Sequence, residues 1–369
     1  MNTFEGKQIF DERGAPDTRY PVCLEGQSSC SMEWRDRVRG ANAMNLYFDS
    51  VADDQKRRRA LYLGSIFVCA PSSSALGFCE FARELIETTF HPYDPRTVQQ
   101  SLPVERSVEL LAKLKPEFIH HPRSKQFIQR ILVERGCDPE KTYFDVPRLR
   151  TAFPSDYLSS GIAYAFHPHR DTWYSAPFCQ VNWWLPVYEI TPDNGMAFHP
   201  QYWDSPVLNN SSSYNYYEWN RISRQSAASH IKADTRIQPR PQISLEPDPQ
   251  LRLVVNVGGA VLFSAAQLHS TVPNTCGVTR YSIDFRTVNV DDLRNRHGAA
   301  NIDSACTGTT LRDYVRASDF TRIPEEVLAL YFDGTEVAFT PSPSGDPLTM
   351  PKASSTPAIH GSVQKLQRG

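Results

Sequence analysis

Residues 179–190 read CQVNWWLPVYEI, a short run rich in aromatic and β-branched side chains that Pro186 interrupts. Similar runs recur between residues 143 and 290, namely GIAYAF at 161–166, LRLVVNV at 251–257, GAVLFS at 259–264 and RYSIDFRTVNV at 280–290. Short strands separated by Gly, Pro and Asn are typical of an all-β barrel or sandwich. We therefore expect a mainly β core over residues 143–290.

Residues 74–136 show the helical period instead. Apolar side chains recur every three or four positions at 78–86, 104–114 and 127–132. We expect Ser74 to cap the first helix, Pro116 to end the second and Gly136 to close the third. Because none of these helices carries paired acids or histidines at ligand spacing, we expect them to flank and support the β core.

The composition changes again at both ends of the chain and in one internal segment. Residues 1–60 are polar and broken by Gly and Pro, which predicts an N-terminal extension before a single domain at 61–340. The tail 341–369 is a low-complexity sequence that predicts flexibility. Residues 204–246 hold the polar stretch NNSSSYNYYEWN and are too long for a plain connection, so they form either a functional lid or a disordered segment.

Charge and cysteine content exclude several classes of protein. The 369 residues include 39 Lys and Arg against 41 Asp and Glu, a formal net charge of −2 that offers no electrostatic attraction to nucleic acid or an anionic membrane. There is no apolar run long enough to span a bilayer and no secretory signal pattern at the N-terminus. The eight cysteines are scattered without a CxxC pair. We expect a reduced, cytoplasmic protein with a small-molecule partner; the sequence gives no indication of its oligomeric state.

The most informative short segment is HPHRD at residues 167–171. His169 and Asp171 lie two residues apart, so at the end of a strand their side chains point to one side. His269 follows 100 residues after His169, just beyond the run GAVLFS. Two imidazoles and one carboxylate can occupy one face of an octahedral ion such as Fe(II) and leave three positions open. We predict His169, Asp171 and His269 as catalytic metal ligands, although His167 with His169 would also suit a cupin-type metal site.

Arg280 and Ser282 form a second candidate site at the start of the last strand. They lie two residues apart and therefore share one face of that strand. A planar guanidinium beside a hydroxyl is suited to binding a carboxylate through two hydrogen bonds. Arg286 shares this face by alternation but lies too far along the strand to belong to the same clamp.

The order H-x-D, about 100 residues, H, ten residues and R-x-S resembles that of the Fe(II)/2-oxoglutarate-dependent dioxygenases. VNWWLPVYEITPDNGMAFHPQYW at 181–203 and GGAVLFSAAQLHSTVPNTCGVTRYSIDFR at 258–286 are similar to two segments of the phytanoyl-CoA dioxygenase-like family. The resemblance covers roughly residues 160–290. The chain departs from the family at Gly258-Gly259, where Gly-Asp is more common, and this difference concerns a turn.

The resemblance implies a double-stranded β-helix, or jelly-roll, core flanked by the N-terminal helices. It also implies Fe(II) as cofactor, 2-oxoglutarate as co-substrate and O2 as oxidant. In this family pattern, iron would be held by His169, Asp171 and His269. The residues implied in binding 2-oxoglutarate are Arg280, Ser282, Thr271, Trp184 and Asn182.

The reaction implied by the resemblance is oxidation of an unactivated C–H bond with release of succinate and CO2. We expect hydroxylation of an amino-acid-like or specialised-metabolite substrate, with desaturation or ring formation as the other possible outcomes; the carboxylate at Asp171 argues against chlorination, which needs that ligand position vacant. A cupin-like metal-dependent isomerase and a non-catalytic jelly-roll binding protein remain the alternatives. The R-x-S clamp would have no role in a cupin-like isomerase.

Aromatic residues crowd the part of the chain between residues 164 and 219. Such density arises either from core packing with a tyrosine-rich loop or from a substrate pocket with apolar walls. Tyr164 and Trp173 flank the metal motif and are the candidates for substrate contact. Arg170, between the two proposed ligands, is either a surface residue or the partner of an acidic group on the substrate.

Overall fold

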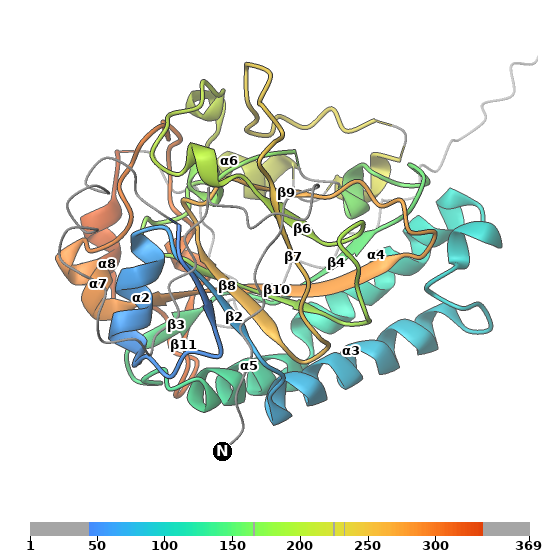
Figure 1. Ribbon diagram of the computed structural model, residues 1–369, viewed down its shortest axis with the longest axis horizontal. Helices are drawn as coiled ribbons and strands as arrows, with labels where there is room; N and C mark the ends of the chain where they lie inside the picture. Colours follow the sequence, from blue (N-terminus) through green and yellow to red (C-terminus); the bar gives the residue numbers. More distant parts are fainter. Residues whose placement is uncertain (1–43, 165–166, 224–225, 232, 335–369) are drawn as a thin grey trace, which may run out of the picture.

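The computed structural model describes residues 44–334 apart from 165–166, 224–225 and 232, and shows a sheet-rich fold with helices (Figure 1). In spatial order the larger sheet contains β1 (Leu46–Phe48), β2 (Ile66–Cys69), β8 (Ala260–Ser264), β5 (Val181–Pro186), β10 (Arg280–Asn289), β3 (Thr142–Phe144) and β11 (Val315–Arg316), and β4 (Arg148–Ala152) also pairs with β10. The smaller sheet contains β7 (Leu251–Leu253), β6 (Met196–Phe198) and β9 (His269–Thr271). β1 and β2 are parallel, and the other strand pairs described are antiparallel.

The helices cluster mainly in the N-terminal part of the described chain. They are α2 (Asp54–Tyr62), α3 (Ser73–Phe90), α4 (Val104–His120), α5 (Pro122–Glu134), α6 (Tyr216–Glu218), α7 (Val290–Asn295) and α8 (Glu325–Leu328). Short 3-10 helices include η2 (Gly161–Ala163) and η3 (Asp171–Tyr174), and a π-helical turn, η6 (Trp219–Ser223), follows α6. The long helices α3, α4 and α5 run along one side of the larger sheet (Figure 1).

Alternation along the central strands separates two environments. On β10, Tyr281, Ile283 and Phe285 are fully buried and belong to the core that the larger sheet shares with the helices. The residues that alternate with them, including Arg280 and Ser282, point to the opposite face, because successive side chains of a strand alternate. Polar groups on a buried strand face need partners or a ligand, so this face of β10 is where the chain can build a site.

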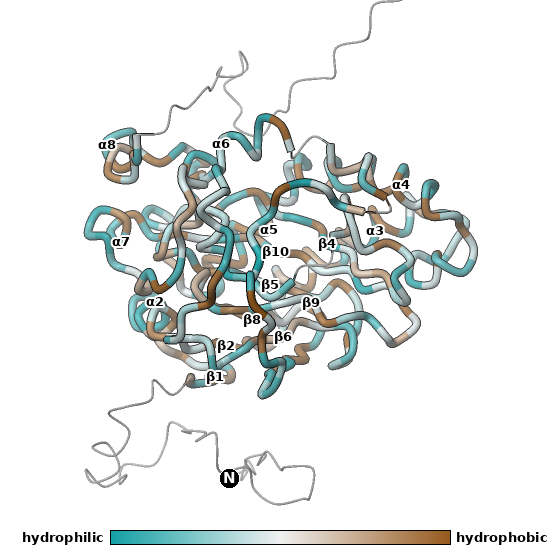
Figure 2. The backbone as a smooth tube through the Cα atoms, turned by 90° about the horizontal axis from the view of Figure 1, so that it is seen from above, coloured by the Kyte–Doolittle hydropathy of each residue, from teal (hydrophilic) through white to brown (hydrophobic). Residues whose placement is uncertain are grey.

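Two apolar cores hold the layers together. The first joins the larger sheet to α3, α4 and α5 and includes Trp183, which stacks on Phe285 at 5.5 Å between ring centroids. The second lies between the sheets and includes Trp184, Phe198 and Phe263. Figure 2 shows hydrophobic colour along strands such as β8 and more hydrophilic colour in many outer loops. The alternation of Trp183 and Trp184 thus fills both cores from one strand.

The start of α3 differs from the sequence-based expectation. The helix begins at Ser73 with Ser72 as N-cap, and Ser74 lies inside its first turn. Glu134 at the end of α5 accepts hydrogen bonds from the Ser74 backbone N–H, at 3.1 Å, and from the Ser74 hydroxyl, at 2.6 Å. A carboxylate from a neighbouring helix therefore satisfies a donor that a local cap would have satisfied.

The other two predicted helix ends have different outcomes. Gly136 has a φ of +73° just after α5, the left-handed conformation that commonly follows a helix, so that prediction is confirmed. The prediction at Pro116 is wrong, because α4 continues through Pro116 to His120. Its missing N–H is tolerated since α4 buries Leu114 on one side of this position and Phe118 on the other, and tertiary packing outweighs local propensity.

The predicted extension, tail and insertion are covered by the structure to different extents. β1 and most of α2 lie before residue 61, and β1 pairs with β2 in the larger sheet. Residues 1–43 of the predicted extension and the whole predicted tail 341–369 lie outside the described residues. Residues 204–246 form turns and short helices between β6 and β7, with no strand among their described residues.

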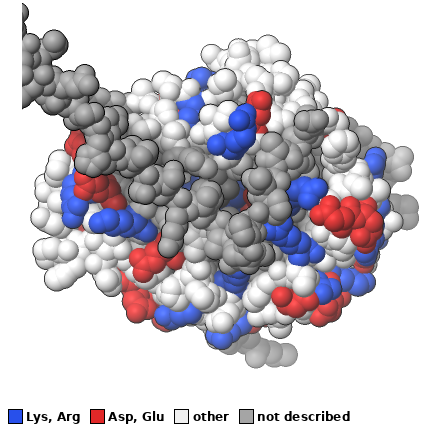
Figure 3. All heavy atoms as spheres, turned by 180° about the vertical axis from the view of Figure 1, so that it is seen from behind, with Lys and Arg blue, Asp and Glu red and all other residues white. Residues whose placement is uncertain are grey.

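The described residues also bear on the expectations about cysteines, surface charge and membrane-spanning segments. The described cysteines Cys69, Cys79, Cys137, Cys179, Cys276 and Cys306 are free thiols. On the face seen in Figure 3, acidic and basic side chains alternate with uncharged ones across the described part of the surface. Within the part of the chain that the structure covers, helices fall short of the length and apolar character needed to cross a bilayer.

The stacked pair Trp183–Phe285 gives a direct test of the packing between the larger sheet and the helices. Phe285→Ala should lower the free energy of unfolding by roughly 3–5 kcal/mol, because a buried ring is lost and a cavity remains. Urea unfolding followed by circular dichroism measures this change. Phe48→Ala is the matched control, since Phe48 is 60% exposed, and equal losses for the two variants would contradict the assigned core.

Candidate metal centre

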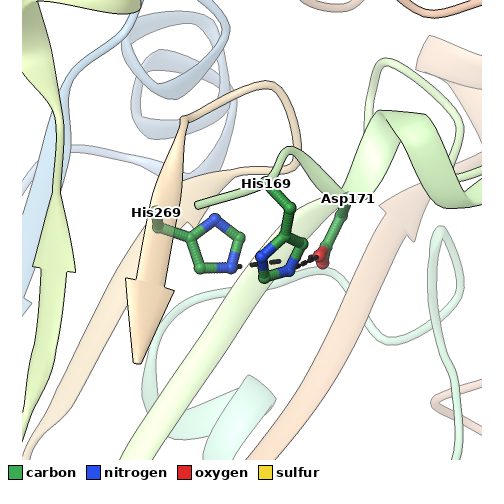
Figure 4. Close-up of side chains that lie close together, drawn as sticks. All are labelled: His169, Asp171 and His269. Atoms are coloured by element: carbon green, nitrogen blue, oxygen red, sulfur yellow. Dashed lines mark ion pairs between the residues drawn. The ribbon is translucent and has the colours of Figure 1, made fainter. Parts of the chain in front are cut away.

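His169 and His269 are joined directly through their backbones. The N–H of His169 donates to the carbonyl of His269 at 2.9 Å, and the N–H of His269 donates back to the carbonyl of His169 at 3.0 Å. His269 is the first residue of β9, so His169 extends the smaller sheet by an antiparallel bridge. Asp171 then opens the 3-10 helix η3, which turns its carboxylate back towards the histidines (Figure 4).

The structure brings together the three residues that the sequence predicts as metal ligands. One ligand atom from each of His169, Asp171 and His269 lies within 4.8 Å of the others, and all three side chains are buried. Oδ1 of Asp171 lies 3.3 Å from Nε2 of His169 and 3.9 Å from Nε2 of His269. Figure 4 shows the imidazoles and the carboxylate converging on a common point.

Backbone carbonyls fix which nitrogen of each imidazole faces this point. Nδ1 of His169 lies 2.8 Å from the carbonyl of His167, and Nδ1 of His269 lies 3.0 Å from the carbonyl of Gln267. A carbonyl can only accept, so each Nδ1 carries the proton and each Nε2 presents a lone pair. Three electron-pair donors therefore face one another in a buried place, and only a cation, either a proton or a metal ion, relieves their repulsion.

Burial and the neighbouring groups shift the pKa values of two members of the cluster. Burial by itself would raise the pKa of Asp171, but its hydrogen-bonding contact with His169 and the electrostatic influence of His269 and His169 lower it to about 2. Burial, with repulsion from His169, lowers the pKa of His269 to about 4. At neutral pH the cluster therefore contains a carboxylate and a neutral His269, the protonation states that metal binding needs.

Polar groups of Gln180, just before β5, and of Arg286 on β10 lie near the other oxygen of Asp171. The side-chain amide of Gln180 donates to Oδ2 at 3.2 Å, and Nε of Arg286 lies 3.7 Å from the same oxygen. Arg286 also pairs with Asp145 at 3.4 Å and with Asp284 at 3.5 Å. Strand alternation does place Arg286 on the site face, but the sequence gives no sign that its partner is Asp171 rather than a co-substrate.

Arg280 and Ser282 lie on the same face of β10, as predicted, and are buried to 5% and 0% exposure. The Arg280 guanidinium carbon lies 5.6 Å from the centre of the Trp184 ring. Among the described residues, Nε of Arg280 and Oγ of Ser282 are buried polar atoms without a hydrogen-bond partner. Burial lowers the pKa of Arg280 to about 10, so the guanidinium remains charged at neutral pH.

The remaining predicted co-substrate residues lie on the strands around this face. Asn182 on β5 pairs in register with Arg286 and accepts a 2.8 Å hydrogen bond from Gln180. Thr271 lies on β9 two residues after His269 and therefore on the same strand face. Their contact with a co-substrate stays a prediction.

Arg170 and Trp173 have structural partners. Arg170 is 1% exposed, so the alternative of a surface residue is wrong; its Nε donates to Asp303 at 3.1 Å and its other nitrogens to backbone carbonyls. Trp173 is 0% exposed and donates from Nε1 to Asp303 at 2.7 Å. Their role in substrate binding remains a prediction.

Tyr164 and His167 lie beside the cluster but outside it. The Tyr164 ring contacts the ring of His167 edge-on at 5.8 Å between centroids. His167 is exposed and does not belong to the group of ligand atoms formed by His169, Asp171 and His269. The structure thus gives no support to the paired-histidine alternative within the described residues, and Tyr164 stays a candidate substrate contact.

Aromatic contacts connect the insertion 204–246 to the cluster. The Tyr174 ring packs edge-on against His169 at 5.4 Å and against Tyr214 at 5.3 Å, and Tyr214 contacts Trp219 at 5.9 Å. The Tyr174 hydroxyl also donates to the carbonyl of Pro239 at 3.1 Å. The insertion is therefore linked to His169 through Tyr174, while its function as a lid stays a prediction.

No protein-family model and no curated protein matches this chain. Among solved structures, EvdO2 from Micromonospora carbonacea var. aurantiaca, complexed with 2-oxoglutarate, is 14% identical, covers 65% of this chain and 93% of its own, and has a TM-score of 0.38. The epimerase SnoN, in complex with Fe3+, alpha ketoglutarate and nogalamycin RO, is 13% identical, with 64% and 83% covered and a TM-score of 0.33. AviO1 from Streptomyces viridochromogenes Tue57 is 14% identical, with 61% and 89% covered and a TM-score of 0.31. At such low identities and TM-scores, function has to be judged from this chain's own side chains.

The lowered pKa of His269 predicts how the metal-free protein responds to acid. Between pH 6.5 and about 4 the unfolded chain takes up a proton at His269 that the folded protein does not, so stability falls as the pH is lowered through this window. The contribution is up to about 3 kcal/mol. Urea unfolding at several pH values in the presence of a chelator measures it. His269→Gln should show a shallower pH dependence in this window, and an unchanged slope would contradict the assigned burial.

Proposed function

We propose that this protein is an Fe(II)/2-oxoglutarate-dependent oxygenase that oxidises a C–H bond of a small-molecule substrate. The observation that carries the proposal is the buried convergence of His169, Asp171 and His269, with both Nε2 atoms turned towards Oδ1 of the carboxylate. Two imidazoles and one carboxylate are the donor set of non-haem iron oxygenases, which keep positions open for the co-substrate and oxygen.

The residues present fit a ferrous ion. Each imidazole has its Nδ1 bonded to a backbone carbonyl, which orients the ring and leaves Nε2 for the metal. His269 is neutral at physiological pH, so binding there does not require removal of a proton. The three ligands come from two segments joined by backbone hydrogen bonds, which favours a site that is formed before the metal arrives.

The residues present also fit a dicarboxylate co-substrate. Within the described part of the chain, Nε of Arg280 and Oγ of Ser282 are buried without partners, a costly arrangement unless a ligand supplies the missing acceptor. A carboxylate is the natural acceptor for a guanidinium and a hydroxyl together. The Trp184 ring lies beside the Arg280 guanidinium and offers an apolar surface next to this pair.

The bound iron and 2-oxoglutarate would supply the oxidising chemistry, in which O2, 2-oxoglutarate and substrate yield succinate, CO2 and a substrate carrying one added oxygen atom. The protein's own contribution would be to bind and orient the reactants. His169, Asp171 and His269 would bind the metal, and Arg280 with Ser282 would orient the distal carboxylate of 2-oxoglutarate. Tyr174 and Tyr214 from the overlying segments would shield the reacting centre from water.

The proposal also includes the architecture of the core, the branch of the oxygenase superfamily and the type of reaction. The two facing sheets, with the ligands at the end of the smaller one, support a double-stranded β-helix core. The sequence pattern supports the phytanoyl-CoA dioxygenase-like branch and hydroxylation of an amino-acid-like or specialised-metabolite substrate. The position of His167 outside the cluster counts against a cupin-like isomerase, and only an activity measurement separates the oxygenase from a non-catalytic binding protein.

Succinate formation tests the proposed function without knowledge of the substrate. Purified protein with Fe(II), 2-oxoglutarate and O2 should release succinate slowly even when no substrate is added. Asp171→Ala should abolish this release, because a metal with two neutral ligands is bound weakly. Quantitative mass spectrometry of succinate measures both. Equal, background-level succinate from the two proteins, across a metabolite library, would contradict the oxygenase.

Arg280 gives a separate test of the co-substrate site. Arg280→Ala should raise the 2-oxoglutarate concentration needed for half-maximal succinate release roughly 10- to 100-fold, because a charge-assisted hydrogen bond is lost. Arg280→Lys should recover part of the loss by restoring the charge. Arg294→Ala is the control, since Arg294 is 47% exposed and remote from this face. A wild-type requirement in Arg280→Ala would show that the clamp is assigned to the wrong residue.

A further inference from the structure

The side chain of Gln180 contacts Oδ2 of Asp171, the carboxylate oxygen that is not the one close to the histidines. Gln180 is 2% exposed and lies immediately before β5. Its Nε2 donates to Oδ2 of Asp171 at 3.2 Å and to Oδ1 of Asn182 at 2.8 Å, while its Oε1 accepts from the hydroxyl of Tyr314 at 2.7 Å. Every polar atom of this amide therefore has a partner.

The chemistry of the partners determines which way the amide points. The carboxylate of Asp171 can only accept hydrogen bonds, and the side-chain oxygen of Asn182 also accepts. The nitrogen of the Gln180 amide, which donates, must therefore face both oxygens. If the amide of Gln180 were turned over, its oxygen would face the oxygen of Asp171 and its nitrogen would face the donating hydroxyl of Tyr314. The chain Tyr314–Gln180–Asp171 is thus directional, and each member donates to the next.

The backbone of Gln180 is held as firmly as its side chain. Its N–H donates to the carbonyl of Pro177 at 2.9 Å, and its carbonyl accepts from the N–H of Ala265 at 3.1 Å. The carbonyl of Ala265 in turn accepts from the N–H of Thr172, next to Asp171, at 3.3 Å. Gln180 and Asp171 are therefore anchored to the same turn after β8, so the distance between them is set by the fold.

Tyr314 belongs to a part of the chain that wraps around the loop carrying the ligands. Tyr314 is 1% exposed and directly precedes β11. Upstream of it, Ser304 donates from its hydroxyl to the carbonyl of Thr172 at 2.6 Å, and Ser175 donates to the carbonyl of Thr307 at 2.7 Å. The segment 304–314, far from the metal motif in sequence, thus contacts both ends of the loop 171–175.

We propose that Gln180, held by Tyr314, is a positioning residue that binds Oδ2 of Asp171 and so leaves Oδ1 alone to bind the metal. Coordination through one oxygen keeps a position open that a carboxylate binding through both oxygens would fill. This inference rests on the proposed metal site. It goes beyond the three ligands because it assigns the geometry of the carboxylate to residues outside the recognisable motif.

Arg286 does not account for the same effect. Its Nε lies 3.7 Å from Oδ2 of Asp171, beyond hydrogen-bond distance, and its charge is shared with Asp145 and Asp284. The amide of Gln180 makes the shorter and directional contact. Removing the Gln180 amide would take this 3.2 Å hydrogen bond away from the buried Oδ2 of Asp171.

Cobalt(II) binding to the full-length protein tests the inference, because high-spin cobalt reports both affinity and coordination in its visible absorption. Gln180→Leu should weaken Co(II) binding roughly 10- to 100-fold and change the intensity of the visible bands. Tyr314→Phe should give a smaller loss in the same direction, since Gln180 remains but is no longer held. This second variant keeps the ring and therefore its packing, so the test does not depend on Gln180→Leu folding well.

Gln129→Leu provides the matched control. The Gln129 amide donates to the carbonyls of Ala317 and Ser318, away from the metal cluster, so its loss should leave the Co(II) affinity and spectrum unchanged. If wild-type protein binds Co(II) and both Gln180→Leu and Tyr314→Phe match it in affinity and spectrum, the positioning role is refuted. If wild-type protein itself binds no Co(II), the proposed metal site fails, and the inference fails with it.

Discussion

Two backbone hydrogen bonds between His169 and His269 set the geometry on which the site depends. They join segments 100 residues apart, and each imidazole is then oriented by a carbonyl two residues earlier in its own segment. As a result the ring positions follow from the main chain rather than from flexible side chains. With Asp171 turned inwards by a short 3-10 helix, three lone pairs meet in a buried place that requires a cation.

The sequence was sufficient for the parts of the site that depend on local periodicity. His169 and Asp171 share a side because they lie two residues apart at a strand end, and Arg280 and Ser282 share a strand face for the same reason. The spacing of short aromatic-rich runs likewise predicted a β core, and the apolar period over 74–136 predicted the three long helices. Such features need only the geometry of one strand or one helix, which a single sequence contains.

Features that depend on contacts between distant segments could not be predicted in this way. Nothing near Gln180 indicates that Tyr314 donates to it, and nothing near Arg170 indicates that Asp303 is its acid partner. The helix end at Pro116 was wrong for a related reason, because packing against the sheet outweighed a local signal. The proposed metal ligands are recognisable from sequence, whereas the residues that hold them in place are found only in the folded chain.

The central claim is that His169, Asp171 and His269 bind one metal ion. The most direct measurement is a crystal structure of the protein loaded anaerobically with Fe(II), with diffraction data collected at the iron absorption edge. The account predicts a single anomalous peak about 2.0–2.2 Å from both Nε2 atoms and from Oδ1 of Asp171, the usual length of bonds from imidazole and carboxylate to a divalent transition metal. Saturating iron without a peak between these three side chains, or with a peak held by other residues, would contradict it.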